Sequence, residues 1–225
     1  MKSSMLVFIM ALGPAMAFAG DISGTVRAEG KPGVESPADG GGKYESRKFK
    51  FVERLDYTQL RDFVVYVDQP TAEKPTPPAK PLEVVTQKDA TFKPHVLPVV
   101  IGTTVSWPNQ DEILHNVYSF SETKQFDLGL YKNEVKTVNF DKSGRVDVFC
   151  SIHSKMHCVI LVLENPYFAT TDAKGGFTIT NVPPGIYRVK AWHERLPPQV
   201  KQITVPEKGA VKVDFVLGIK GLPQY

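Results

Sequence analysis

Short stretches of alternating and continuous hydrophobic residues run along this chain, and they predict β-strands. Asp21–Arg27, Lys48–Glu53 and Val135–Phe140 alternate apolar and polar residues, whereas Phe63–Val67 and Val159–Leu163 are continuously apolar. Alternation with a period of two is typical of a strand with one buried face, and a short β-branched run is typical of a strand covered on both faces. No sustained helical periodicity follows the first twenty residues. We therefore predict an all-β fold.

The segment between residues 82 and 163 continues this pattern with closely spaced strands. Its turn signals are rich in Gly, Pro, Asn and Asp, which favour chain reversal. Phe126–Gly129 contains both Asp and Gly, and we predict a turn there. The further strands that we predict in this segment are Leu82–Thr86, Phe92–Val100, Thr103–Trp107 and Arg145–Cys150.

The first nineteen residues have the pattern of a secretory signal peptide. Lys2 gives a charged start, Met5–Leu12 is apolar, and Ala17-Phe18-Ala19 is a small-x-small cleavage motif. The apolar run is shorter than the roughly 20 residues needed to span a membrane. No later apolar run is long enough either. We therefore expect a periplasmic or extracellular protein with no membrane span.

Length and charge narrow the functional classes. A chain of 225 residues has room for one or two domains. Its formal net charge is +3, and loss of the predicted signal peptide with Lys2 leaves +2. That charge is too small to indicate a nucleic-acid partner. The chain also lacks the G-x-S-x-G, H-E-x-x-H and P-loop motifs.

The candidate chemistry lies in the spacing Cys150-x-x-His153-x-x-Met156, taken together with His115 upstream. Two imidazoles, one thiolate and a weak axial thioether are the ligand set of a blue-copper electron-transfer site. We therefore predict that these four residues bind one copper ion. His157 follows Met156 directly and is the rival ligand, although it points away from Met156 if a strand has already begun.

This central segment resembles the cupredoxins, the plastocyanin and amicyanin group of small blue-copper proteins. The resemblance depends on Gly102-x-x-Val105-x-Trp107-x-Asn109-x-Asp111, on His115-Asn116 and on the Cys150–Met156 loop. It implies a Greek-key β-sandwich over residues 83–163 and one-electron transfer between Cu(II) and Cu(I).

The cupredoxin resemblance also implies roles for residues around the ligands. A hydrogen bond between Asn116 and Ser151 would join two ligand loops, and an unidentified redox partner protein would dock near His153. An enzymatic copper protein such as an oxidase or nitrite reductase would need further His-rich motifs, which the sequence lacks. We therefore expect an electron carrier and not an enzyme.

A second resemblance appears after residue 163. Thr171-Asp172-x-x-Gly175-x-Phe177-x-Ile179, followed by Val182-Pro183-Pro184-Gly185-x-Tyr187, resembles the carboxypeptidase regulatory-like (transthyretin-like) β-sandwich. Its first strands match segments that lie before the cupredoxin-like part. We therefore expect a cupredoxin domain at 83–163, inserted in or packed on a discontinuous transthyretin-like sandwich made of 20–69 and 164–219. Residues 70–82 are the Pro-rich linker.

Two other functions remain open at this level. The same ligands also fit a copper delivery or storage protein that exchanges its metal readily. Alternatively, a Cys150–Cys158 disulfide would leave a metal-free β-sandwich binding module.

Several polar residues and one cysteine outside the ligand set have simpler interpretations. We interpret Cys158 as a small buried hydrophobe. His95 and His193 fit interface or surface residues better than a second metal site. The acidic residues of the turns are interpreted as solvated: Asp111, Glu112 and Asp127. The doubly apolar run Val159–Leu163 is expected to lie against the second sandwich.

Overall fold

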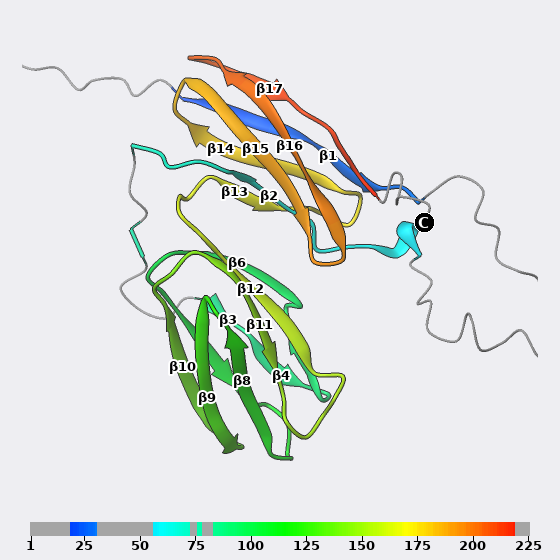
Figure 1. The fold of residues 1–225 in the computed structure, drawn as a ribbon, viewed down its shortest axis with the longest axis vertical. Coiled ribbons are helices and arrows are strands. Elements are labelled where there is room, and N and C mark those ends of the chain that lie inside the picture. Colours follow the sequence, from blue (N-terminus) through cyan, green and yellow to red (C-terminus); the bar gives the residue numbers. More distant parts are fainter. Residues whose placement is uncertain (1–18, 31–55, 73–75, 78–82, 219–225) are drawn as a thin grey trace, which may run out of the picture.

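The computed structural model describes residues 19–30, 56–72, 76–77 and 83–218, and these residues form an all-β protein (Figure 1). Within the described part, the one helical segment is a single 3-10 turn, η2 (Tyr57–Gln59). The prediction of an all-β fold is confirmed. Three predictions cannot be compared in full with the described residues. The predicted strand Lys48–Glu53 lies wholly outside them. The predicted signal peptide lies outside them at residues 1–18, and the predicted linker at residues 73–75 and 78–82.

Strands from the two ends of the chain form two facing sheets, which we call the terminal sandwich. One sheet has the order β14-β1-β17, with β18 also paired to β1, and the other has the order β13-β2-β15-β16. Ile22, Val65, Val189 and Phe215 are among the buried side chains between them. The strands are β1 (Gly20–Ala28), β2 (Val64–Val67), β13 (Phe168–Thr170), β14 (Gly176–Val182), β15 (Gly185–His193), β16 (Leu196–Val205), β17 (Ala210–Lys212) and β18 (Phe215–Leu217).

The strands between β2 and β13 form a separate set of sheets, which we call the central sandwich. Its sheets have the orders β10-β7-β3 and β6-β12-β11-β8-β9, and β4-β5 is a small hairpin. Trp107, Phe140, Val148 and Ile160 are buried in its core. The strands are β3 (Glu83–Val84), β4 (Thr86–Lys88), β5 (Thr91–Lys93), β6 (Val96–Val100), β7 (Thr103–Pro108), β8 (His115–Ser121), β9 (Lys124–Tyr131), β10 (Val135–Phe140), β11 (Gly144–Phe149) and β12 (His157–Leu163).

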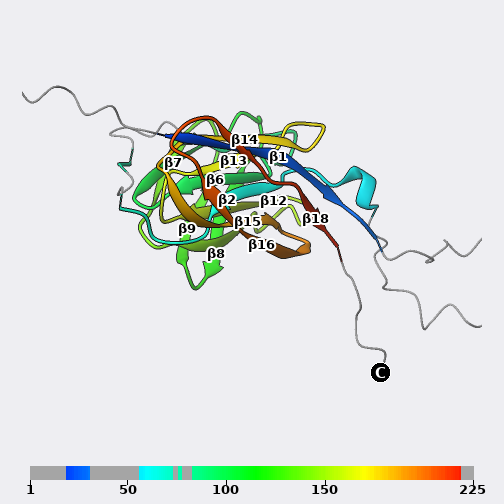
Figure 2. The same ribbon diagram turned by 90° about the horizontal axis from the view of Figure 1, so that it is seen from above.

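The two sandwiches pack on each other through a third apolar cluster. Val159, Leu161 and Leu163 on one face of β12 are buried there, together with Val64 of β2 and Val96 of β6. Figure 1 shows β6 and β12 beside β2 and β13, and Figure 2, seen from above, shows β1 and β14 lying over the central sandwich. The prediction that Val159–Leu163 is covered on both faces is confirmed.

The predicted turn at Phe126–Gly129 is wrong, because these residues lie inside β9. The pairing of β8 with β9 shifts register between Asn116 and Tyr118. Gly129 has a φ of 67°, and its N–H donates to the Asp127 carboxylate over 2.8 Å. Asp and Gly are common in β-bulges as well as in turns, so the sequence pattern did not distinguish the two. The strand continues through the bulge.

The predicted strands Thr103–Trp107, Val135–Phe140 and Arg145–Cys150 are found close to their expected bounds. The prediction Phe92–Val100 is divided into β5 and β6, which belong to different sheets. The prediction Leu82–Thr86 is divided, since β3 and β4 lie on either side of Val85 and belong to different sheets. The predicted domain boundaries stay a prediction. The strand pairing supports them, because in the described part of the chain β1 and β2 pair with later strands of the terminal sandwich.

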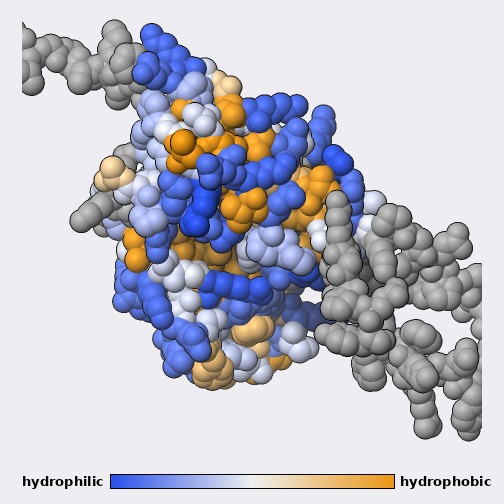
Figure 3. Space-filling view, turned by 45° about the horizontal axis from the view of Figure 1, so that its top comes forward, coloured by the Kyte–Doolittle hydropathy of each residue, from blue (hydrophilic) through white to orange (hydrophobic). Residues whose placement is uncertain are grey.

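Two further observations concern the surface. Among the described residues, no helix is long and apolar enough to cross a membrane. On the face drawn in Figure 3, hydrophobic side chains lie among hydrophilic ones and do not form one continuous field.

Candidate metal centre

The loop that carries three of the four predicted ligands is short and closed by its own backbone. It joins β11, which ends at Phe149, to β12, which begins at His157. The N–H of Cys150 donates to the carbonyl of Met156 over 3.2 Å, and the N–H of Met156 donates to the carbonyl of His153 over 3.0 Å. These bonds fix the backbone from which all three side chains project.

The fourth predicted ligand, His115, is the first residue of β8 and is fully buried. The strand β8 pairs with β11 at Tyr118 and Phe149, which brings His115 to the end of the sheet where the loop lies. Its Nε2 lies 2.8 Å from Oδ2 of Asp111. With Nε2–H donated to this carboxylate, the Nδ1 lone pair faces the loop. A metal-binding histidine is usually oriented by such a second contact.

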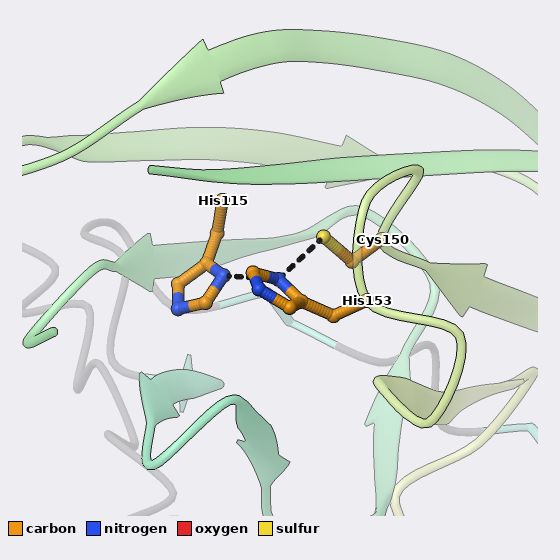
Figure 4. Close-up of side chains that lie close together, drawn as sticks. All are labelled: His115, Cys150 and His153. Carbon is orange, nitrogen blue, oxygen red and sulfur yellow. Dashed lines mark hydrogen bonds between the residues drawn. The ribbon is translucent and has the colours of Figure 1, made fainter. Parts of the chain in front are cut away.

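The structure brings His115, Cys150 and His153 together (Figure 4). Nδ1 of His115 lies 3.1 Å from Nδ1 of His153, and that atom lies 3.7 Å from Sγ of Cys150. All three ligand atoms lie within 4.8 Å of one another. Metal–nitrogen bonds of about 2.0 Å and metal–sulfur bonds of about 2.3 Å place neighbouring ligand atoms roughly 3 to 4 Å apart. The donor set and its spacing therefore fit a single ion such as copper.

Met156 contributes a buried thioether near this group. Its side chain is 1% exposed and belongs to the same core cluster as Cys150. Its backbone bonds to Cys150 and His153 hold it at the end of the closed loop. Its role as axial ligand stays a prediction.

Asn116 connects the two ligand segments. Its Oδ1 accepts a hydrogen bond from the N–H of Ser151 over 3.3 Å, and its own N–H lies 3.5 Å from Sγ of Cys150. Its Nδ2 donates to Oδ1 of Asp127 over 2.7 Å. Asn116 is almost fully buried, so these contacts hold the first residues after His115 and Cys150 in fixed register.

The interpretation of Asp111 as solvated is wrong, because its side chain is 14% exposed, whereas Asp127 is exposed as predicted. Besides His115, Asp111 accepts backbone hydrogen bonds from Asp89 and Ala90 in the β4–β5 turn. Burial opposes ionisation of Asp111, but the hydrogen bonds from Ala90, His115 and Asp89 outweigh it and lower its pKa. The pKa of Asp127 is also lowered, first by the Gly129 N–H and then by Asn116. The side chain of Glu112 is exposed, as predicted.

Cys158 is a free thiol in the core, and so is Cys150. The interpretation of Cys158 as a buried hydrophobe is confirmed, since it is fully buried and pairs with Val148 across the ladder between β11 and β12. Burial raises the pKa of its thiol well above the ordinary value, and the nearby Asp147 and Glu194 add to this effect. The alternative of a Cys150–Cys158 disulfide is therefore not what the structure shows.

The remaining histidines lie away from this group. His157 begins β12 and contacts Asp147, and its ring stacks on Phe149 at a centroid distance of 4.8 Å. His95 lies beside Glu194, whose hydrogen bond raises the pKa of His95. His193 is buried, and burial lowers its pKa.

Comparisons with known proteins found one family model and several similar solved structures. Residues 159–218 match the family model of the carboxypeptidase regulatory-like domain. No curated protein sequence matches the chain. Similar solved structures include a mutant of amicyanin in the Cu(I) state, which is 22% identical in sequence. The match covers 36% of this chain and 81% of the amicyanin chain, with a TM-score of 0.34. A reduced Cu(I) amicyanin mutant at pH 4 has 24% identity, coverage of 38% and 85%, and a TM-score of 0.35.

A third similar structure is the copper-containing nitrite reductase (NirK) of Thermus scotoductus SA-01. It has 27% identity and a TM-score of 0.36, and the match covers 43% of this chain and 26% of that chain. The chain is thus similar to a carboxypeptidase regulatory-like domain in its C-terminal part, and structures similar to it include an amicyanin and a copper-containing nitrite reductase.

Proposed function

We propose that the protein is a mononuclear type 1 copper protein that transfers single electrons. The observation that carries this proposal is the convergence of His115 Nδ1, His153 Nδ1 and Cys150 Sγ at one end of the central sandwich. Two imidazoles and a thiol with a nearby buried thioether select copper over Mg²⁺ or Ca²⁺, which prefer oxygen ligands. Copper, when bound, supplies the Cu(II)/Cu(I) couple.

The residues of the chain keep this ligand set nearly unchanged between two oxidation states. Asp111 orients His115 through Nε2, and the two backbone bonds of the Cys150–Met156 loop fix the other ligands. The N–H of Asn116 points at the sulfur of Cys150 and offsets negative charge on a thiolate. A ligand set held by hydrogen bonds and core packing moves little when an electron arrives, which favours fast electron transfer.

A redox partner would dock where His153 approaches the surface. His153 is half-buried, while its neighbour Ile152 is 52% exposed. Ile113 and Leu114, which precede His115, are also about half exposed. Apolar side chains on the surface next to a redox ligand fit a transient protein contact, because they can be desolvated without loss of hydrogen bonds.

We further propose that the protein is an exported electron carrier and not an enzyme. The signal-like segment 1–19 supports export to the periplasm or the extracellular space. The sequence lacks the further His-rich motifs that a copper oxidase or nitrite reductase would need.

The test is the visible spectrum of the mature protein after addition of one equivalent of Cu(II). We expect an intense blue or green absorption from thiolate bonding, and its loss in Cys150→Ser. Cys158→Ser is the matched control and keeps the colour. A colourless wild-type protein after copper addition would overturn the proposal.

A second measurement separates electron transfer from copper delivery. An electron carrier keeps its copper against a competing chelator for hours and shows a reversible one-electron wave in voltammetry. Release of copper within minutes, without such a wave, would instead support delivery or storage.

A further inference from the structure

A second group of metal-binding side chains lies at the contact between the two sandwiches. His95 precedes β6 and His157 begins β12, and both belong to the central sandwich. Glu194 lies in the turn between β15 and β16 of the terminal sandwich. Their ligand atoms lie within 4.8 Å of one another. None of the three takes part in the copper site proposed above.

The distances show how these groups face one another. Nε2 of His95 lies 2.7 Å from Oε1 of Glu194, and Nδ1 of His157 lies 3.9 Å from Oε2 of the same carboxylate. Bonds of about 2.0 to 2.2 Å from one ion to imidazole nitrogen and carboxylate oxygen require ligand atoms at separations similar to these. One carboxylate is therefore shared between two imidazoles from the neighbouring sandwich.

The ring nitrogens that face away from Glu194 have their own acceptors. Without a metal, Nε2 of His95 donates to Glu194. Nδ1 of His95 lies 3.1 Å from the backbone carbonyl of His157 and keeps its proton there, so Nε2 presents its lone pair once a metal ion displaces the Nε2 proton. Nε2 of His157 lies 3.1 Å from Oδ1 of Asp147, which leaves the lone pair on Nδ1. Both lone pairs thus point toward Glu194. Metal-binding histidines are held by this kind of second contact, to a carbonyl or to a carboxylate.

Arg145 contacts both Asp147 and the backbone of Glu194 beside the His95–His157–Glu194 group. It donates two hydrogen bonds to Asp147, over 2.8 and 2.6 Å, and a third to the backbone carbonyl of Glu194 over 3.2 Å. The charge of Asp147 is thereby balanced by Arg145. The carboxylate of Glu194 is not paired with Arg145, so its charge is available to a metal ion that displaces the His95 Nε2 proton.

We propose that His95 Nε2, His157 Nδ1 and the Glu194 carboxylate bind one divalent transition-metal ion, which cross-links the two sandwiches. Two imidazoles and one carboxylate form an open site suited to Zn²⁺, with a fourth position left for water. The side chain of His95 is 38% exposed, so the ion reaches the site from solvent. The site is independent of the copper site, since it shares no ligand with it.

The test uses Zn²⁺ as the probe in a Cys150→Ser/His153→Gln background, which disables the first site. Isothermal titration calorimetry is expected to give one Zn²⁺ per chain. His95→Gln and Glu194→Gln are each expected to weaken binding at least tenfold. Glu112→Gln is the matched control for Glu194→Gln, because it makes the same chemical change at an exposed carboxylate outside the cluster and leaves binding unchanged.

A second readout does not depend on the titration. Zn²⁺ is expected to raise the midpoint of thermal unfolding in this background, because it binds the folded state with ligands from both sandwiches, and Glu194→Gln removes the rise. Circular dichroism checks that each variant is folded. If His95→Gln or Glu194→Gln does not fold, Asp147→Asn is measured in its place, because it keeps all three ligands. Asp147→Asn removes the carboxylate that orients His157 and is expected to weaken Zn²⁺ binding at least tenfold. Absence of Zn²⁺ binding, or binding indifferent to both His95→Gln and Glu194→Gln, would leave only a His–Glu ion pair and overturn the proposal.

Discussion

Asn116 is the residue whose replacement tests how the ligand loops are held. Asn116→Ala removes the hydrogen bond from the Ser151 N–H and the one to Asp127. It keeps the backbone N–H that faces Cys150. The variant therefore loosens the connection between the two ligand segments without removing a predicted ligand.

The expected loss in the free energy of unfolding follows from these two bonds. The 2.7 Å bond to Asp127 is charge-assisted, but Asp127 is exposed and water replaces the lost donor, so we count about 1 kcal/mol. The 3.3 Å bond from Ser151 contributes about 0.5 kcal/mol. Truncating a side chain that is 3% exposed adds a small cavity. The sum is about 2 kcal/mol.

Urea unfolding of the metal-free protein, followed by tryptophan fluorescence, measures this loss. With a slope of about 2 kcal/mol per molar urea, the midpoint falls by about 1 M. Asn139→Ala is the matched control, because Asn139 also donates two hydrogen bonds from its amide but is exposed. A loss for Asn116→Ala no larger than that of the control would refute the reasoning.

Three further predictions concern the sandwiches. Leu161→Ala at the contact between them is expected to lower the free energy of unfolding by about 3 kcal/mol in urea melts, because Leu161 is buried in that cluster. Gly24→Ala is expected to cost about 1 to 3 kcal/mol in the same assay, since the added methyl group would overlap the backbone carbonyl oxygen of Val213. Hydrogen bonds from the Thr25 side chain and backbone lower the pKa of the Asp214 carboxyl group. The ionised carboxylate therefore stabilises the folded protein above about pH 4, and this stabilisation is lost as the pH falls through the lowered pKa. Thermal melts of wild type and Asp214→Asn should therefore differ near neutral pH and converge in acid.

The sequence predicted the parts of the site that depend on local spacing. Cys150, His153 and Met156 lie within seven consecutive residues, so any tight loop brings them close together. The strands around them are short and rich in β-branched residues, which made their type clear although not every boundary. The hydrogen bond between Asn116 and Ser151 was expected from the resemblance to cupredoxins, and the structure contains it.

The parts that were missed depend on contacts between distant segments. Asp111 binds His115 and the amides of Asp89 and Ala90, which lie about twenty residues earlier, and nothing in its own neighbourhood indicates this. The group His95, His157 and Glu194 spans 99 residues of chain between His95 and Glu194 and forms only when the two sandwiches pack together. A carboxylate in a turn has the same local pattern whether it is solvated or holds an imidazole.

The strand β12 shows why the two sandwiches belong to one functional structure. Cys158, Ile160 and Val162 face the core of the central sandwich, while Val159, Leu161 and Leu163 face the terminal sandwich. The strand begins directly after the loop that carries the predicted copper ligands, so its position fixes the end of that loop. Because both of its faces are buried, a shift of β12 would cost apolar contacts in two cores at once. The terminal sandwich therefore stabilises the strand that follows Met156.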